Sequence, residues 1–296
     1  MIKISVPATS ANLGPGYDSF GLSYQLYNTF SIEERHNGKL TIRGVSRRYQ
    51  GKSNLVYKAM LKVFNHVNYR PGGIYIHSQV NVPVSRGLGS SATCIVAGLI
   101  GANILSGSQL DEKTIFEMAV EMEQHPDNIV PAFYGGLTTA TLIDGIPYYI
   151  KKQVSDTLAF HVIIPDFTVS TFEARKVLPK KLLHSDAAHN VAFATMSFEA
   201  LQNGDVDILK HCMRDRLHEP YRRTLIHHYD IVTAFARSIG CINYCISGSG
   251  PTILIITEKT NTTFFDLMSE FLKENYKDWQ LLTVNPDQNG VIVERD

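Results

Sequence analysis

The segment Pro83–Thr93 has the residue types and spacing that most directly suggest chemistry. It combines glycines with hydroxyl side chains, and the apolar run 94–100 that follows predicts a helix beginning inside it. The first turn of a helix has unpaired N–H groups and the positive end of the helix dipole, and glycines let an anion approach that backbone closely. The segment therefore suggests a phosphate site, although a glycine-rich turn with a serine cap would have the same composition.

The predicted phosphate loop differs from the P-loop of nucleotide-binding proteins. It has no Gly-Lys-Ser or Gly-Lys-Thr, and no lysine at all. Phosphate charge at this loop must then be balanced by backbone N–H groups, hydroxyls, a metal ion or cations from distant parts of the chain.

Two further segments, Val6–Leu22 and Ile246–Leu254, strengthen the functional interpretation. Taken in order with the loop, they resemble the three motifs of the GHMP kinases, and the first resembles the homoserine kinase branch of that superfamily. Three shorter matches agree with that branch, and they are Gln124–Asn128, Ser170–Arg175 and Glu219–Arg222.

The resemblance implies an ATP site built around the loop, with Asn54 contacting adenine. Asn54 is also well suited to cap a helix, and both roles can hold together. The residues implied for ATP binding are Asn54, Pro83, Arg86, Gly87, Leu88, Gly89, Ser90 and Ser91.

The same resemblance implies Mg²⁺, held by one serine of the loop and one glutamate. Ser90 and Ser91 are both candidates for the hydroxyl ligand. The family places its acid eleven residues before the position of Asn128, which selects Glu117, while Glu121 and Glu123 on the same stretch stay open. Magnesium prefers such oxygen ligands together with phosphate and water.

Homoserine is a zwitterion with a primary hydroxyl, so its site needs a cation, an acid and a polar group. The resemblance assigns Arg175 and Arg222 to the carboxylate, since a guanidinium pairs with it bidentately. Asp18 would take the ammonium group. The residues implied to assist are Asn12, Thr171 and Gly248. Considered alone, Arg175 could be a surface arginine, and Asn12 and Asp18 could serve a turn.

The catalytic residues implied are Asn128, His125 and Glu117. Asn128 would orient the substrate hydroxyl, and His125 would line the pocket. Related kinases have an aspartate where this chain has Asn128, and an asparagine cannot accept a proton. We therefore expect Mg²⁺-assisted in-line transfer without a dedicated side-chain base. Small departures from the family pattern occur at Tyr17, where phenylalanine is usual, at Thr93, where alanine is common, and at Gln124, where glycine is usual.

Bulk composition describes an ordinary globular protein. The chain has 296 residues, 44% of them hydrophobic and 19% charged, with a formal net charge of zero. This balance argues against nucleic acid or a membrane as a partner. The four cysteines show neither a disulfide framework nor a zinc spacing, and no leader peptide is evident, so we expect a cytoplasmic protein. The resemblance suggests a homodimer.

Periodicity predicts strands mixed with helices, without a strict alternation, which favours an α+β fold. Strands are expected over 2–6, 137–143, 160–164, 253–257, 280–284 and 290–293, with a hairpin around Asn37-Gly38. Helices are expected over 54–67, 90–105, 114–123, 187–203, 205–217, 224–238 and 262–274. A polar cluster near 151–157 suggests two domains, 1–155 and 156–296. The resemblance implies a ribosomal-protein-S5-like fold for the first and a ferredoxin-like fold for the second, with the site between them.

Two other functions stay open. The chain could be a different GHMP kinase, such as a mevalonate or sugar kinase, although mevalonate has no ammonium group for Asp18 and a sugar needs no arginine pair. It could also be a non-catalytic sensor on the same fold, which the apparent retention of the metal acid and the loop serines disfavours.

Overall fold

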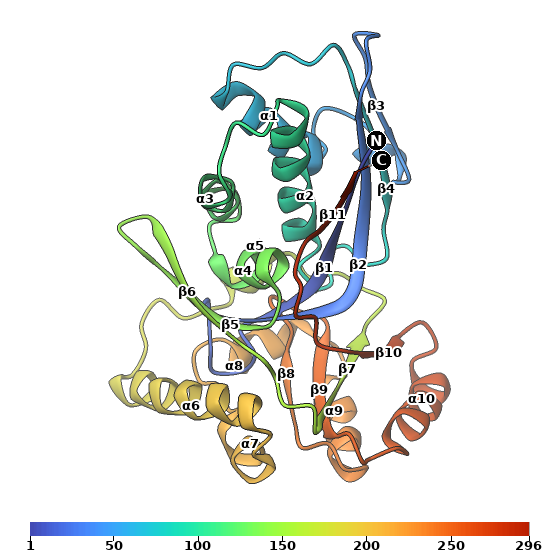
Figure 1. Ribbon diagram of the computed structural model, residues 1–296. Helices are drawn as coiled ribbons and strands as arrows, with labels where there is room; N and C mark the ends of the chain where they lie inside the picture. The colour runs from blue at the N-terminus through green and yellow to red at the C-terminus, as the bar shows by residue number, and fades with distance from the viewer. Residues whose placement is uncertain (296) are drawn as a thin grey trace.

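The computed structural model describes residues 1–295; Asp296, the last residue of the second predicted domain, lies outside the described residues. Two β-sheets organise the molecule, one in each half, with helices packed around them (Figure 1). The mixture of antiparallel strands and helices confirms the α+β prediction.

The first sheet has seven strands, in the order β11-β1-β2-β4-β3, with β5 paired to β2 and β6 paired to β5. Ile2, Ile4 and Val6 are buried and Lys3 is exposed, as the predicted alternation requires. The strands are β1 (Ile2–Ala11), β2 (Phe20–Glu34), β3 (Leu40–Arg43), β4 (Ile74–Gln79), β5 (Leu137–Ile143), β6 (Ile146–Lys152) and β11 (Ile292–Arg295).

Helices pack on one side of this sheet and bury its apolar face (Figure 1). They are α1 (Leu55–His66), α2 (Ser90–Leu105), α3 (Glu112–Glu123) and α4 (Pro126–Tyr134). The predictions for 54–67, 90–105 and 114–123 are thereby confirmed to within two residues. Helix α2 lies in the middle of this layer, against α1 and β1, so the loop before it is anchored by the core.

The predicted hairpin around Asn37-Gly38 is wrong. The turn joins β2 to β3, but these strands do not pair, because β4 lies between them. Strand β4 pairs antiparallel with β2 and parallel with β3. A turn dipeptide reports a local reversal of the chain, and it cannot show that a distant strand will insert between the two arms.

The second sheet has four antiparallel strands in the order β10-β7-β9-β8. They are β7 (Leu158–Ile164), β8 (Asn243–Ile246), β9 (Ile253–Glu258) and β10 (Gln280–Val284). The helical segment after β7 and helix α10 before β10 complete the ferredoxin-like β-α-β-β-α-β order, as expected.

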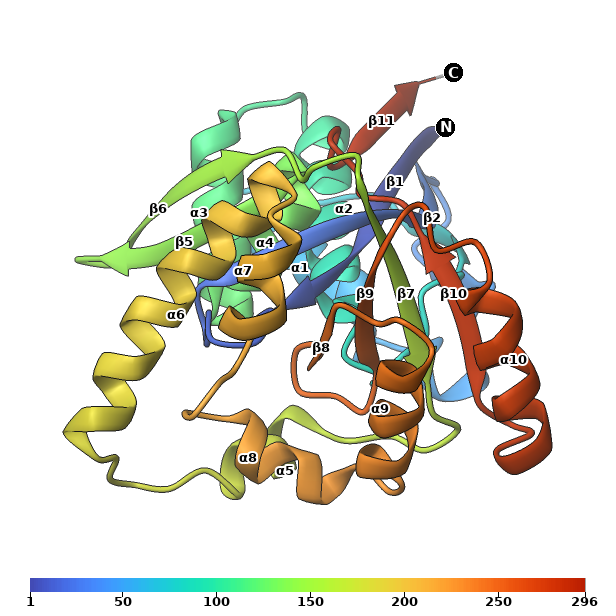
Figure 2. The ribbon, with the colours of Figure 1, turned by 90° about the horizontal axis from the view of Figure 1, so that it is seen from below.

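The helices of the second half lie around this sheet, as Figure 2 shows. They are α5 (Thr171–Lys176), α6 (His184–Asn203), α7 (Val206–Cys212), α8 (Glu219–Arg222), α9 (Tyr229–Ser238) and α10 (Phe264–Asn275), with short 3₁₀ turns at Arg47–Tyr49 and Arg223–Leu225.

Two helix predictions in this half are too long. The helix expected over 205–217 ends at Cys212, because the chain turns at Asp215, whose carboxylate accepts the backbone N–H groups of His218 and Glu219. The helix expected over 224–238 begins only at Tyr229, since His228 has a left-handed backbone with φ of 62°.

The C-terminal strand returns to the first sheet. Strand β11 pairs antiparallel with β1, so the two ends of the chain lie side by side (Figure 1). The strand expected over 290–293 is displaced to Ile292–Arg295. A division of the chain at 155/156 therefore does not account for β11, which the fold groups with residues 1–155.

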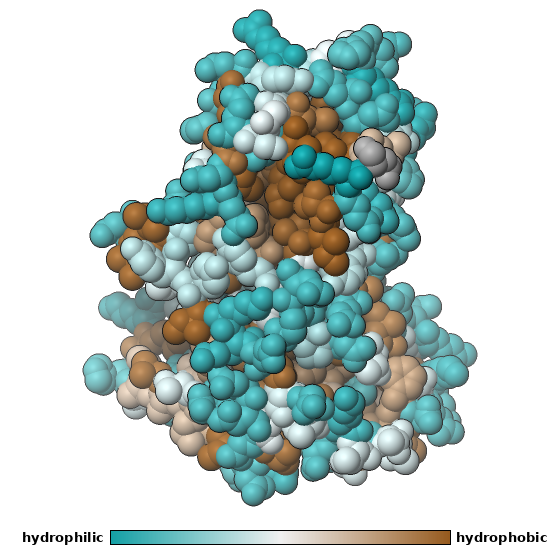
Figure 3. All heavy atoms as spheres, viewed as in Figure 1, coloured by the Kyte–Doolittle hydropathy of each residue, from teal (hydrophilic) through white to brown (hydrophobic). Residues whose placement is uncertain are grey.

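The surface is mixed in character. In Figure 3 hydrophobic residues gather over α2 in the first half, while the second half shows mostly hydrophilic residues on that face. Within residues 1–295, no helix has the length and apolar character needed to cross a membrane.

Candidate active site

A cavity of about 400 Å³ lies where the two halves meet. Residues from β1, the loop before α2, α3, α4, α5 and α8 line it, together with Gly248 and Ser249. Of the residues predicted for the site, the lining includes Asn12, Asp18, Asn54, Arg86, Gly87, Leu88, Gly89, Ser90, Ser91, His125, Asn128, Thr171, Arg175, Arg222 and Gly248. It does not include Pro83 or Glu117.

The loop before α2 requires glycine at two positions. Gly89 has φ of +65°, and a Cβ atom there would stand 1.9 Å from Thr9 Oγ1. Gly87 has φ of +78°, and a Cβ atom there would stand 2.2 Å from the Ser247 carbonyl oxygen. The loop is therefore packed against β1 and against the segment after β8, and it opens into α2 at Ser90.

These contacts bring the three glycine-containing motifs together. Ser247 Oγ donates to the Gly87 carbonyl at 2.6 Å, and it also lies 2.6 Å from Ser10 Oγ. The Gly248 N–H donates to the Ala11 carbonyl at 3.0 Å. Segments separated by more than 150 residues thus share one wall of the cavity.

Arg86 joins the loop to the second half of the molecule. Its guanidinium donates to the Pro165 carbonyl at 2.9 Å and to the Asp166 carbonyl at 2.6 Å. Two of its five N–H donors therefore bind backbone carbonyl groups of the second half, and Arg86 helps to fix the width of the cavity between the two halves.

Asn54 stands at the end of the cavity nearest α1. Its side chain accepts from the Tyr57 N–H at 3.2 Å, so it caps α1, and it donates to the Tyr49 carbonyl at 2.9 Å. Apolar side chains surround this end of the cavity; the lining includes Phe30, Val45, Leu55, Val80 and Val84. A flat, apolar group would fit such surroundings.

Glu123 is the glutamate whose side chain contacts the first turn of α2, directly after the loop. Ser91 Oγ donates to Glu123 Oε1 at 2.6 Å, and burial raises the pKa of this carboxyl above its ordinary value. Both side chains line the cavity, and together they offer the oxygen ligands that Mg²⁺ prefers. Within residues 1–295, no group of three or more His, Cys, Asp or Glu forms a ready metal site.

Glu117, the sequence-based choice for the metal ligand, does not join this cluster. It lies six residues earlier on α3, and its carboxylate is 3.8 Å from Lys113 Nζ. Glu121 likewise turns outward, 2.8 Å from Lys62 Nζ. The reason is a short connection: α3 ends at Glu123, Gln124 has a left-handed backbone, and α4 begins at Pro126.

Asp18 and Arg175 form an ion pair at the cavity. Arg175 donates to Asp18 Oδ1 at 2.9 Å and to the Tyr17 hydroxyl at 3.0 Å. The backbone N–H of Asp18 donates to Asn12 Oδ1 at 2.9 Å. Arg175 is thus no free surface arginine, and the Tyr17 hydroxyl, which a phenylalanine would lack, helps to hold it.

Arg222 is buried, and it is 2% exposed. It donates to the Gly248 carbonyl at 2.9 Å, and Asn12 Nδ2 donates to the same oxygen at 2.8 Å. Its guanidinium also lies over the Tyr17 ring, 5.1 Å from the centroid. The cavity therefore holds a second cation whose hydrogen-bond partners are all neutral, in a position to attract an anionic group.

Asn128 and His125 stand at the start of α4. Thr9 Oγ1 donates to Asn128 Oδ1 at 2.7 Å, which leaves the Asn128 amide N–H groups to donate. His125 Nδ1 lies 4.0 Å from Asp18 Oδ2, and burial lowers the pKa of His125 below its ordinary value. Thr171, the first residue of α5, is exposed and lines the opposite side of the cavity.

Asp127 is a site residue that the sequence reasoning did not single out. It lines the cavity although only 3% exposed, and its Oδ1 has no hydrogen-bond partner among the described residues. Burial raises its pKa to about 7. Its neighbours Asn128 and His125 were both selected, but nothing in its spacing indicated that this carboxyl would face inward.

Comparisons with known proteins agree with this geometry. The family model described as GHMP kinases N terminal domain matches residues 54–136, and GHMP kinases C terminal matches residues 197–266. A homoserine kinase of Clostridium botulinum (strain Okra / Type B1) is 38% identical over 293 residues, covering 99% of this chain and 98% of that protein. One of Clostridium beijerinckii is 39% identical over 294 residues, with the same coverage of both chains.

Solved structures show the same fold. The crystal structure of homoserine kinase from Cytophaga hutchinsonii has a TM-score of 0.87 and 27% identity, covering 99% of this chain and 97% of that one. A mevalonate kinase from L. major has a TM-score of 0.70 and 18% identity, covering 96% of each chain, which shows a common fold alone.

Proposed function

Because this chain belongs to the homoserine kinases within the GHMP kinase family, we propose that it transfers the γ-phosphoryl group of ATP to the hydroxyl of L-homoserine. The product would be O-phospho-L-homoserine, in threonine biosynthesis. One observation carries this proposal: a single cavity joins the glycine loop at the start of α2 to a pair of arginines, Arg175 and Arg222.

At the nucleotide end, the loop from Gly87 to Ser91 would hold the phosphates. Backbone N–H groups at the start of α2 face the cavity, and the helix dipole favours negative charge there. Asn54 and the apolar residues near it would take the adenine.

For the metal, Glu123 and Ser91 fit Mg²⁺ better than Glu117 does, because they are in contact with each other at the loop. When bound, Mg²⁺ neutralises charge that develops on the transferring phosphate oxygens. Ser90, next to them at the helix start, remains an alternative source of the hydroxyl.

At the acceptor end, the residues match the three polar parts of homoserine. Arg175 and Arg222 would bind the carboxylate, with Thr171 and the Gly248 segment completing the pocket. Asp18, fixed by Asn12, would bind the ammonium group. Arg175 and Asp18 form an ion pair with each other in this structure. Bound homoserine would place its carboxylate at Arg175 and its ammonium group at Asp18, so each side chain would then also contact a substrate group of opposite charge.

The transfer itself would depend on placement. Asn128, oriented by Thr9, would donate to the substrate hydroxyl oxygen and aim it at the γ-phosphorus. An asparagine accepts no proton, and His125 would act by lining the pocket in its neutral form, so the hydroxyl proton would pass to the phosphate oxygens. Asp127, whose Oδ1 has no hydrogen-bond partner among the described residues, would accept a hydrogen bond from the substrate.

We also propose a homodimer that works in the cytoplasm, as the resemblance to the family suggests. Sedimentation velocity on the purified chain measures the oligomeric state directly. A single species near twice the 33.1 kDa chain mass would support the homodimer, and a single species at that mass would contradict it.

The test of function is a coupled assay of ADP release with ATP and Mg²⁺, comparing L-homoserine, mevalonate and galactose as acceptors. We expect turnover with L-homoserine and loss of that turnover in Arg222→Ala and Asn128→Ala. Turnover with another acceptor would contradict the substrate assignment while keeping the kinase. Nucleotide binding without any turnover would instead indicate a sensor.

A further inference from the structure

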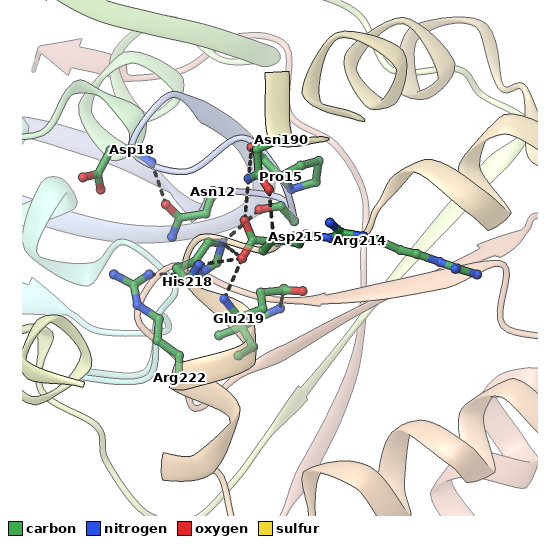
Figure 4. A network of polar contacts seen from close by, with 12 residues as sticks. Asn12, Pro15, Asp18, Asn190, Arg214, Asp215, His218, Glu219 and Arg222 are labelled. Atoms are coloured by element: carbon green, nitrogen blue, oxygen red, sulfur yellow. Dashed lines mark hydrogen bonds and ion pairs between the residues drawn. The ribbon is translucent and has the colours of Figure 1, made fainter. Parts of the chain in front are cut away.

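A buried polar cluster lies behind α8, outside the cavity just described. Asp215 is at its centre, in the turn between α7 and α8, and its side chain is fully buried (Figure 4). Its carboxylate accepts three hydrogen bonds: from Asn190 Nδ2 at 2.7 Å, from the His218 N–H at 2.6 Å and from the Glu219 N–H at 2.7 Å. A buried carboxylate with three donors is strongly fixed in place.

One branch of the cluster reaches the segment before Asp18. Asn190 Nδ2 also donates to the Pro15 carbonyl at 3.1 Å, and its Oδ1 accepts from the Arg216 N–H at 2.9 Å. His218 Nε2 lies 2.9 Å from the Gly14 carbonyl oxygen. The Asp215 carboxylate is therefore linked through Asn190 to the Pro15 carbonyl and through His218 to the Gly14 carbonyl, both in the loop that carries Asp18 (Figure 4).

A second branch reaches Arg222. The Gly14 carbonyl can only accept, so Nε2 of His218 carries the proton and Nδ1 is an acceptor. Arg222 lies 3.4 Å from that Nδ1, and its backbone N–H donates to the His218 carbonyl at 2.9 Å. Burial lowers the pKa of His218 to about 4, so the neutral imidazole that this arrangement needs is the form present at pH 7.

The Tyr17 ring packs over the same imidazole. Their ring centroids are 5.1 Å apart and nearly parallel. Tyr17 in turn contacts Arg175 through its hydroxyl and Arg222 through its ring. Arg222 thus contacts His218, which Asp215 holds, and Arg175 is linked to His218 through Tyr17, while Asp215, Asn190 and His218 themselves do not line the cavity.

We propose that Asp215 is a positioning residue for the acceptor substrate: it fixes the Gly14–Asp18 segment and Arg222 relative to each other without touching the substrate. The proposal rests on the proposed function only in naming homoserine as the ligand to be measured. Because the nucleotide end is built from the other half of the molecule, loss of this carboxylate should affect homoserine and spare ATP.

The test is Asp215→Asn. The new amide can keep one oxygen for the two backbone N–H groups, but its NH₂ group then faces Asn190 Nδ2, donor against donor. We expect KM for homoserine to rise about tenfold or more, which corresponds to the loss of one hydrogen bond of a charged group. KM for ATP should stay within about twofold, the usual range for an uninvolved site.

Asp287→Asn is the matched control. Asp287 is also fully buried, and its Oδ2 accepts the backbone N–H groups of Asn289 at 3.1 Å and Gly290 at 2.6 Å, while Oδ1 accepts from the Tyr27 hydroxyl. It stands away from the cavity lining. We expect a lowered melting temperature in both variants, but a changed KM for homoserine in Asp215→Asn alone.

An unchanged KM for homoserine in Asp215→Asn, or an equal rise in both KM values, would overturn the proposal. Should that variant fail to fold, Asn190→Ala removes the bonds to Asp215, to the Pro15 carbonyl and from the Arg216 N–H, and its KM for homoserine must still rise.

A structure of either variant gives a readout without activity. The 2.9 Å contact between Arg222 and the Gly248 carbonyl should be lengthened or lost, and an unmoved Arg222 would contradict the proposal. If the unsubstituted protein does not turn over homoserine, the proposed function fails, while this measurement still decides the role of Asp215.

Discussion

At the scale of single residues, the site is a set of charges whose partners decide what each can do. Arg175 pairs with the Asp18 carboxylate, whereas the hydrogen-bond partners of Arg222 are neutral, so Arg222 can still bind an anion. Glu123 contacts the loop serine, whereas Glu117 contacts a lysine on its own helix. Residue type alone does not separate these cases, and the contacts do.

The two glutamates give the sharpest comparison at this scale. Glu123→Gln should lower kcat by about 100-fold, because a metal ligand that stabilises charge in the transition state contributes several kcal/mol. The kcat of Glu117→Gln should stay within about twofold of that of the unsubstituted protein. Initial rates across a Mg²⁺ titration measure both. A severe loss in Glu117→Gln with a mild one in Glu123→Gln would reverse the assignment.

Asp127 carries a prediction about pH. Its pKa is raised to about 7, and a bound substrate donor favours the ionised form, so KM for homoserine should fall as pH rises through about 7. Asp127→Asn should raise KM at pH 8 by about tenfold, the value of one charged hydrogen bond, and should remove that dependence. If KM for homoserine in Asp127→Asn still falls as pH rises through 7, the titrating group is not Asp127.

At the scale of elements, the sequence predicted most of the fold because its signals are local. Apolar periodicity located α1, α2 and β1, and the Gly87–Ser91 segment was correctly read as the entry to a helix. The failures came from long-range pairing. Strand β4 inserts beside the Asn37-Gly38 turn, and a carboxylate at Asp215 ends one helical segment and starts another.

The residues of the candidate site could be predicted from the sequence to a similar extent. Motif matches brought Asn12, Asp18 and Asn128 to one cavity. The sequence could not decide among the α3 glutamates, because contact with the loop depends on where the helix ends, and Asp127 was missed because inward orientation leaves no trace in spacing.

The glycine loop provides the element-scale prediction. Gly89→Ala would drive a methyl group into Thr9, which orients Asn128, so kcat should fall by about 100-fold, as expected for a misplacement of about 1 Å. Gly107→Ala is the control, since Gly107 also has a positive φ, +92°, but no atom within 4 Å of a new Cβ. It should cost about 1–2 kcal/mol of stability and leave kcat unchanged. Equal kcat values in the two variants would contradict the account.

At the scale of the whole molecule, the two halves are joined through polar contacts around the cavity and through β11, which carries the chain end back to β1. Buried ionisable groups lie mainly in the second half, behind α8. Their shifted pKa values make the stability of the fold depend on pH.

Glu219 is the clearest of these groups. Burial raises its pKa to about 8, from an ordinary value near 4.3. The folded state therefore holds a proton that the unfolded chain releases, and stability must fall as pH rises from about 4 to about 8. One such proton contributes at most about 1.4 kcal/mol per pH unit.

We expect urea unfolding to show this loss between pH 7 and 8, where Asp127, with a pKa of about 7, adds a smaller loss of its own. Glu219→Gln should remove the larger part of the loss, and Glu199→Gln, at an exposed position on α6, should not. A parent protein that gains stability over that interval would refute a protonated Glu219 in the folded state.

The most direct measurement for the whole account is a crystal structure of the chain with L-homoserine, Mg²⁺ and a non-hydrolysable ATP analogue. We predict the homoserine carboxylate on Arg175 and Arg222, its hydroxyl at Asn128, and the metal on Glu123 and a loop serine. Homoserine bound away from both arginines, or a metal held at Glu117, would contradict the account.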